Sequence, residues 1–153
     1  MPSPIISDAS CFIVLSNIGE LTLLQQVYGG IITTPEIAAE YGEPLPTWVT
    51  VLSVQDKQKQ LLLTMQLDLG ESSAIALALE TPGSTVILDD YKARKVAIRL
   101  GLTLTGTIGV LVKAKLRGII PTIKPLLAKI KLTNFRLSAE LEAEALRAAG
   151  EVQ

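Results

Sequence analysis

Short runs of β-branched and aliphatic residues alternate along this chain with segments whose apolar residues recur at helical spacing. The runs are residues 5–6, 31–33, 85–88 and 102–105, with 48–52 as a further candidate. Continuous apolar runs of this length are typical of strands buried on both faces of a parallel sheet. Parallel strands separated by helices form right-handed βαβ units. The pattern therefore predicts a three-layer α/β/α fold around a central parallel sheet of four to five strands.

Several helix boundaries are marked by residues that suit them. Thr34 can cap a helix that has Pro35 in its first position, because the threonine hydroxyl accepts a free backbone N–H and proline has none to leave unpaired. Gly70 and Glu71 are expected to open another helix, with an acid in its first turn. Gly101 is expected to end a later helix.

The composition is that of one domain with a large apolar core. Apolar residues make up 48% of the 153 residues, but no apolar run approaches the roughly 20 residues that a membrane span needs. No export signal is visible, and the only cysteine, Cys11, lies in an apolar run that favours a small buried thiol. We therefore expect a single domain over residues 1–153, with a core at about 5–149, in the cytoplasm and outside any membrane.

The chain contains no histidine. It cannot build a Ser-His-Asp or Cys-His nucleophile system, a zinc site with histidine ligands, or a histidine acid–base pair. The hydrolytic chemistry that remains is mostly that of carboxylates with a hard metal ion.

The charged residues are sorted along the chain. Through Tyr91 there are eleven Asp or Glu and two Lys, whereas from Lys92 to Arg136 there are eleven Lys or Arg and no acid. Carboxylates that can hold a divalent cation, next to a cationic surface, are what the cleavage of a phosphate backbone requires.

Five basic residues are expected on two helix surfaces. Lys92, Lys95 and Arg99 share one face of the helix after the paired acids, and Lys113 and Arg117 repeat the pattern one helix later. Such a surface can follow a phosphate chain. The alternative is a solubilising face that is balanced by the acidic half or by a partner.

Acidic residues are expected at the ends of strands and helices. Asp8 ends the first predicted strand, and Asp89 and Asp90 follow a later one. If these strands are neighbours, their carboxylates converge on one crevice at the carboxyl edge of the sheet. Glu40 and Glu71 lie at helix ends, and spacing alone leaves open whether they reach that crevice. Each acid has a structural alternative, as a helix cap or as a solvated surface charge.

Five further residues are expected at the site or in the packing beside it. Arg94 either orients a carboxylate or touches a substrate. Thr105 or Thr107 is expected beside the crevice, with its hydroxyl available to a metal-bound water. Gly106 and Gly109 are expected to allow close backbone packing.

Five segments together resemble the PIN-domain family. They are Asp8-Ala9-Ser10 after an apolar strand, Pro35 followed by Glu40, Gly70-Glu71 with the small residues through Ala78, Leu88-Asp89-Asp90 with Arg94, and Gly106-Thr107-Ile108-Gly109. The resemblance covers nearly the whole chain. It is closest to a prokaryotic branch of unknown function, of the DUF3368 type, that is similar to VapC-type toxins.

The resemblance implies a metal-dependent endoribonuclease that hydrolyses RNA phosphodiester bonds with Mg²⁺ or Mn²⁺. Carried over residue by residue, the catalytic acids are Asp8, Glu40, Glu71 and Asp90, and the metal ligands are Asp8, Glu71, Asp89 and Asp90. Glu71 stands where VapC-type sequences usually have Asp. The paired acids leave open whether Asp89, Asp90 or both bind the ion. Ser10, Arg94, Thr105 and Thr107 are expected to support the site.

The resemblance also implies partners. The chain is expected to act as the toxin of a type II toxin–antitoxin pair, with a small antitoxin that blocks the crevice, and to form a homodimer through the apolar excess of its first helices. The alternatives are a non-catalytic PIN-like module that binds nucleic acid and a regulatory interaction protein.

Overall fold

The computed structural model describes residues 3–151. Its strands are β1 (Ile5–Ser7), β2 (Ile31–Thr33), β3 (Val49–Val51), β4 (Thr85–Ile87) and β5 (Thr103–Thr105). They form one sheet in the order β3-β2-β1-β4-β5, and every neighbouring pair is parallel. This confirms the predicted parallel sheet. The candidate strand at 48–52 is present as β3, which brings the number of strands to five.

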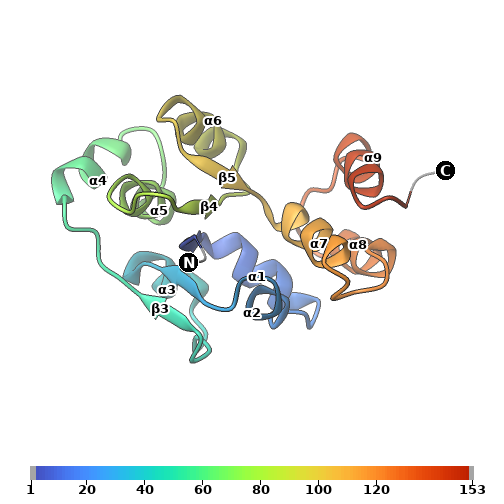
Figure 1. Cartoon of the computed structure of the whole chain (residues 1–153). Coiled ribbons are helices and arrows are strands. Elements are labelled where there is room, and N and C mark those ends of the chain that lie inside the picture. The colour runs from blue at the N-terminus through green and yellow to red at the C-terminus, as the bar shows by residue number, and fades with distance from the viewer. Residues whose placement is uncertain (1–2, 152–153) are drawn as a thin grey trace.

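Helices cover both faces of the sheet. They are α1 (Ala9–Asn17), α2 (Leu23–Tyr28), α3 (Pro35–Tyr41), α4 (Lys57–Leu63), α5 (Leu69–Leu79), α6 (Tyr91–Arg99), α7 (Thr107–Leu116), α8 (Lys124–Lys131) and α9 (Ala139–Ala148). Figure 1 shows α5 and α6 on one side of the sheet and α1, α2 and α7 on the other. The predicted three-layer α/β/α arrangement is thus confirmed. Within residues 3–151, no helix is both long enough and apolar enough to cross a membrane.

The core takes up the apolar residues of the first two helices. Phe12 and Leu15 of α1 and Leu24 of α2 are fully buried, and so is the Cys11 thiol. The prediction that these helices expose an apolar surface for a homodimer is therefore wrong, because α3, α7 and β2 cover their apolar side chains. Large apolar side chains are exposed on α4 instead, at Leu61 and Leu62.

The local signals at helix starts act as expected, with one correction. Thr34 accepts the backbone N–H of Ile37 at 3.1 Å and caps α3. The prediction that α5 opens at Gly70 is wrong by one position, because the helix begins at Leu69. Asp68 is its cap and accepts the backbone N–H of Glu71 at 2.8 Å, because an aspartate oxygen satisfies an N–H that the first turn leaves free.

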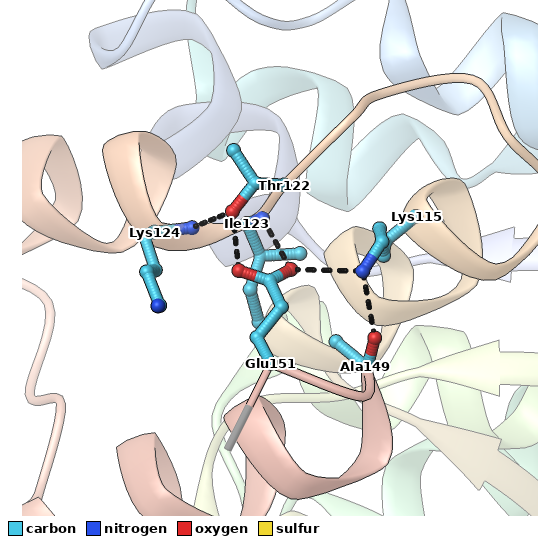
Figure 2. A network of polar contacts seen from close by, with 6 residues as sticks. All are labelled: Lys115, Thr122, Ile123, Lys124, Ala149 and Glu151. Atoms are coloured by element: carbon cyan, nitrogen blue, oxygen red, sulfur yellow. Dashed lines mark hydrogen bonds and ion pairs between the residues drawn. The ribbon is translucent and has the colours of Figure 1, made fainter. Parts of the chain in front are cut away.

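The C-terminal segment is fastened to the rest of the molecule by Glu151 (Figure 2). Its carboxylate accepts hydrogen bonds from the Thr122 hydroxyl, from the backbone N–H of Ile123 at 2.8 Å, and from Lys115 Nζ at 3.4 Å. Lys115 also donates to the carbonyl of Ala149 at 2.8 Å. These contacts hold the end of α9 against α7 and α8, which lie together at one end of the molecule (Figure 1). The start of α8 and the end of α9 are thereby joined.

Candidate active site

An acidic crevice of about 330 Å³ lies at the carboxyl ends of β1 and β4. It is lined by five carboxylates, those of Asp8, Glu40, Glu71, Asp89 and Asp90. β1 and β4 are hydrogen-bonded neighbours in the middle of the sheet, so the acids that follow them meet, as the strand pattern predicted. Among residues 3–151, none of the five carboxylates forms an ion pair with Lys or Arg.

Asp8 forms the floor of the crevice and is only 6% exposed. One carboxylate oxygen accepts the backbone N–H of Cys11 at 2.9 Å, and the other accepts the backbone N–H of Asp89 at 3.0 Å. Asp8 therefore caps α1 and also ties the ends of β1 and β4 together. Burial, followed by the charges of Asp89 and Glu71, raises the pKa of Asp8 well above its usual value despite these hydrogen bonds.

The two adjacent acids after β4 have different surroundings. Asp89 accepts the backbone N–H of Thr107 at 2.8 Å, the Thr107 hydroxyl at 2.5 Å and the Ser10 hydroxyl at 2.6 Å. Asp90 is exposed and uses one oxygen to cap α6 through the backbone N–H of Ala93, at 2.9 Å. Asp89 is therefore held in one orientation, whereas Asp90 keeps an oxygen directed to the solvent side.

Glu40 and Glu71 both reach the crevice, which the spacing had left open. A Cβ built on Gly70 would lie 2.5 Å from Glu40 Oε1, so a side chain at residue 70 would displace the Glu40 carboxylate from its present position. Burial and then the charges of Asp68 and Asp90 raise the pKa of Glu71 to about 7. Burial and the charge of Asp68 also raise the pKa of Glu40.

The sequence analysis missed Asp68 and one loop of the crevice. Asp68 precedes Glu71 by three residues, and this spacing of an N-cap acid before a glutamate is the signal that could have found it. Asn134, Phe135 and Arg136 line the crevice as well, from the loop before α9. No sequence spacing indicates this, because the loop follows the last strand by nearly thirty residues.

Two of the four residues expected to support the site make contacts inside the crevice. Ser10 and Thr107 both donate to Asp89. Arg94 Nη1 instead donates to the carbonyl of Leu88 at 2.7 Å. Thr105 does not line the crevice; its hydroxyl lies 2.2 Å from the position that a Cβ on Gly109 would take. The close packing expected at Gly109 is therefore present.

The five basic residues fall into two separate groups. Lys92, Lys95 and Arg99 are exposed together on α6 and line a small hollow there. Lys113 and Arg117 on α7 contact α2. Lys113 Nζ lies 5.3 Å from the centre of the Tyr28 ring, and the Arg117 guanidinium donates to the carbonyl of Val27. Arg117 thus has a structural role in addition to any contact with a ligand.

The donor atoms of the crevice suit a hard divalent cation. They are carboxylate oxygens, and burial together with the charges of neighbouring acids raises the pKa of Asp8 and of Glu71. Within the described chain, no three acidic, cysteine or histidine side chains form a ready-made metal cluster. Mg²⁺ is commonly held by one or two carboxylates with waters in its remaining positions, so the site still fits such an ion.

The comparison with protein families agrees with the fold. A family model described as a PIN domain, DUF3368, matches residues 4–151. No match was found among the curated proteins or the solved structures. PIN domains are generally nucleases and typically use divalent metals. By this match over nearly its whole length, the chain belongs to the PIN-domain family.

Proposed function

We propose that this protein is an endoribonuclease that hydrolyses RNA phosphodiester bonds with Mg²⁺ or Mn²⁺. The observation that carries the proposal is the crevice itself, in which five carboxylates meet without a basic partner among residues 3–151. Adjacent carboxylates repel one another, and a bound cation would relieve this repulsion. Such clusters are therefore more typical of functional sites than of sites that only stabilise the fold.

The carboxylates would have different roles in metal binding, according to how many hydrogen bonds hold each of them. Asp8 and Asp89 are fixed by backbone and hydroxyl donors, and they would orient the cation. Asp90 and Glu71 face the solvent side and would complete its coordination, with Glu40 beside them. When bound, the divalent ion supplies positive charge that stabilises the negative charge developing on the phosphate.

Substrate binding is assigned to the basic surfaces. Lys92, Lys95 and Arg99 begin two residues after Asp90 and are exposed, so a phosphate chain in the crevice could continue along α6. Each phosphate that such residues neutralise releases counterions, and affinity should therefore fall steeply as salt is added. Lys113 and Arg117 would serve only a longer substrate, because they lie toward α2.

The proposal extends to partners. The family resemblance supports a toxin that is silenced by a small antitoxin over the crevice, and a homodimer for which Leu61, Leu62 and Met65 offer exposed apolar area on and beside α4. Activity in the cytoplasm stays a prediction from the single cysteine. Co-expression with a short reading frame encoded beside the gene, compared with expression alone and followed by mass determination in solution, tests both the antitoxin and the homodimer.

The decisive experiment is cleavage of single-stranded RNA by purified protein with Mg²⁺, Mn²⁺ or EDTA. Asp8→Asn should abolish cleavage, and Glu43→Gln, at an exposed acid outside the crevice, should leave it unchanged. Because an Asn amide would face one of the two N–H donors of Asp8, thermal unfolding is recorded alongside, and Glu71→Gln serves as a second variant.

Each result has a clear reading. Cleavage that persists in EDTA, or that persists in both Asp8→Asn and Glu71→Gln, would contradict the mechanism. RNA binding without cleavage under any metal condition would favour the non-catalytic module instead.

A further inference from the structure

A second pocket adjoins the acidic crevice. It is a hollow of about 410 Å³ between α7, α9 and the end of β5, within the range of roughly 300–1,000 Å³ that small-molecule sites occupy. Asp89, Phe135 and Arg136 line both the crevice and this pocket. A single extended molecule can therefore occupy both at once.

The walls of the second pocket are mainly apolar. Ile108 and Val112 form the α7 side, and Leu141, Ala145 and Ala148 form the α9 side at the spacing of one helix face. Polar groups are few. Glu144 offers a hydrogen-bond acceptor, and Thr105 and Arg94 offer donors. Apolar walls with a few directed polar groups suit a flat heterocycle.

The boundary between the two hollows carries a ring and a cation. Phe135 is half-buried against the core, so its ring is a fixed surface on which a base can stack. Arg136 is exposed, and no ion pair or hydrogen bond of its side chain is present within residues 3–151. A guanidinium that is not engaged elsewhere can bind a phosphate through two parallel hydrogen bonds.

We propose that the second pocket binds the nucleobase next to the phosphodiester in the crevice, and that Arg136 binds the phosphate group that connects them. The proposal rests on the proposed nuclease function of the crevice and adds a binding site for one unstacked base of the substrate. A base that is stacked and paired in a duplex cannot enter a pocket, whereas an unstacked base can.

A matched pair of substitutions on α9 tests the pocket. Ala148→Leu fills it from an exposed position, and Ala139→Leu adds the same side chain at an exposed position of the same helix outside both hollows. Steady-state cleavage of a single-stranded RNA with Mn²⁺ should show KM raised about fivefold or more by Ala148→Leu, the lower end of what one stacked base contributes. Ala139→Leu should leave KM and thermal stability unchanged.

Binding measured without cleavage separates this proposal from the nuclease function. Labelled RNA is titrated into Asp8→Asn, with and without Ala148→Leu, by fluorescence anisotropy. The titration is repeated with RNAs that each lack the base at a different position. For one of these RNAs, Ala148→Leu should no longer lower the affinity, because the base that occupies the pocket is absent. Arg136→Ala should weaken binding and lower the slope of log affinity against log salt by about 1, as expected for one lost phosphate contact.

The outcomes are distinguishable. If wild-type protein cleaves RNA but Ala148→Leu and Ala139→Leu bind and cleave alike, the pocket proposal is wrong and the nuclease proposal stands. If wild-type protein cleaves nothing but Ala148→Leu weakens binding in the base-dependent way, the pocket stands and the nuclease proposal falls.

Discussion

Asp8 is a buried carboxylate, with 6% of the residue exposed, whereas Glu151 is a partly buried residue with 7% of its side chain exposed. Asp8 shares its crevice with four other acids and has a raised pKa. Glu151 accepts hydrogen bonds from a hydroxyl, a backbone N–H and Lys115, and these contacts lower its pKa although burial acts in the opposite direction (Figure 2). Burial alone therefore does not decide whether a carboxylate stabilises the fold; its neighbours do.

The contrast suggests two different uses of the same chemical group. The Glu151 network is complete within the chain and serves the fold. In the crevice, no carboxylate forms an ion pair with Lys or Arg of residues 3–151, and its oxygens are available to a ligand. The following predictions separate the two regions.

The largest expected difference is in catalysis. Glu71→Gln should lower kcat/KM for RNA by about 10- to 100-fold, which is the range for loss of a partner in a metal site. Glu151→Gln should change it little, because Glu151 lies outside the crevice. Cleavage assays with Mn²⁺ measure both, and equal losses in the two variants would contradict a functional division between the regions.

Divalent metal should stabilise the protein through the crevice. At a Mn²⁺ concentration of 100 times Kd, the free energy of unfolding should rise by about 2.7 kcal/mol, which corresponds to a rise in Tm of roughly 5–10 °C for a chain of this size. The shift should be retained in Glu151→Gln. Persistence of the full shift in a variant that combines Glu71→Gln with Asp90→Asn would place the ion elsewhere.

Loss of the Glu151 carboxylate should destabilise the fold without a metal effect. Glu151→Ala leaves the N–H of Ile123 and the ammonium of Lys115 without this acceptor, and an unpaired buried donor costs about 1–3 kcal/mol. Urea unfolding measures the loss, with Glu43→Ala as an exposed control. A midpoint equal to that of wild type would show that the network contributes nothing.

The smallest and most diagnostic difference should be in pH dependence without metal. The pKa of Glu71 rises from 4.5 to about 7 on folding, so its contribution to stability is full below pH 4.5 and is lost as pH rises toward 7. Glu151 has a lowered pKa, so its contribution is present above 4.5 and is lost as pH falls further.

Unfolding of wild type, Glu71→Gln and Glu151→Gln in EDTA across this range measures the two slopes. The free energy of unfolding of Glu71→Gln, relative to that of wild type, should increase as the pH rises from 4.5 to 7. Glu151→Gln should be less stable than wild type above pH 4.5, and this difference should disappear at lower pH. Slopes of the same sign in both variants would remove the distinction between the two environments.

Much of the fold follows from local signals. Apolar runs flanked by turn residues predicted the strands, because a strand buried on both faces needs no polar alternation. Thr34 and Pro35 marked the start of α3 because capping depends only on residues within one turn. The meeting of Asp8 with Asp89 needed only the rule that the carboxyl ends of neighbouring parallel strands share an edge.

Contacts between distant segments could not be predicted in this way. Arg136 reaches the crevice from the loop between α8 and α9, and the Glu151 contacts at the end of α9 involve residues up to 36 positions away. The different surroundings of Asp89 and Asp90 depend on Ser10 and Thr107, which come from α1 and α7. No spacing within one segment contains that information.

The sequence by itself determined the parallel sheet, the edge at which the acids gather and the kind of chemistry that a chain without histidine can perform. Only the tertiary structure decided which carboxylates are held and which remain open, and which of them have shifted pKa values. The physical reason is that propensity, capping and strand pattern act over a few residues, whereas burial and electrostatic interaction depend on groups that other segments bring into contact.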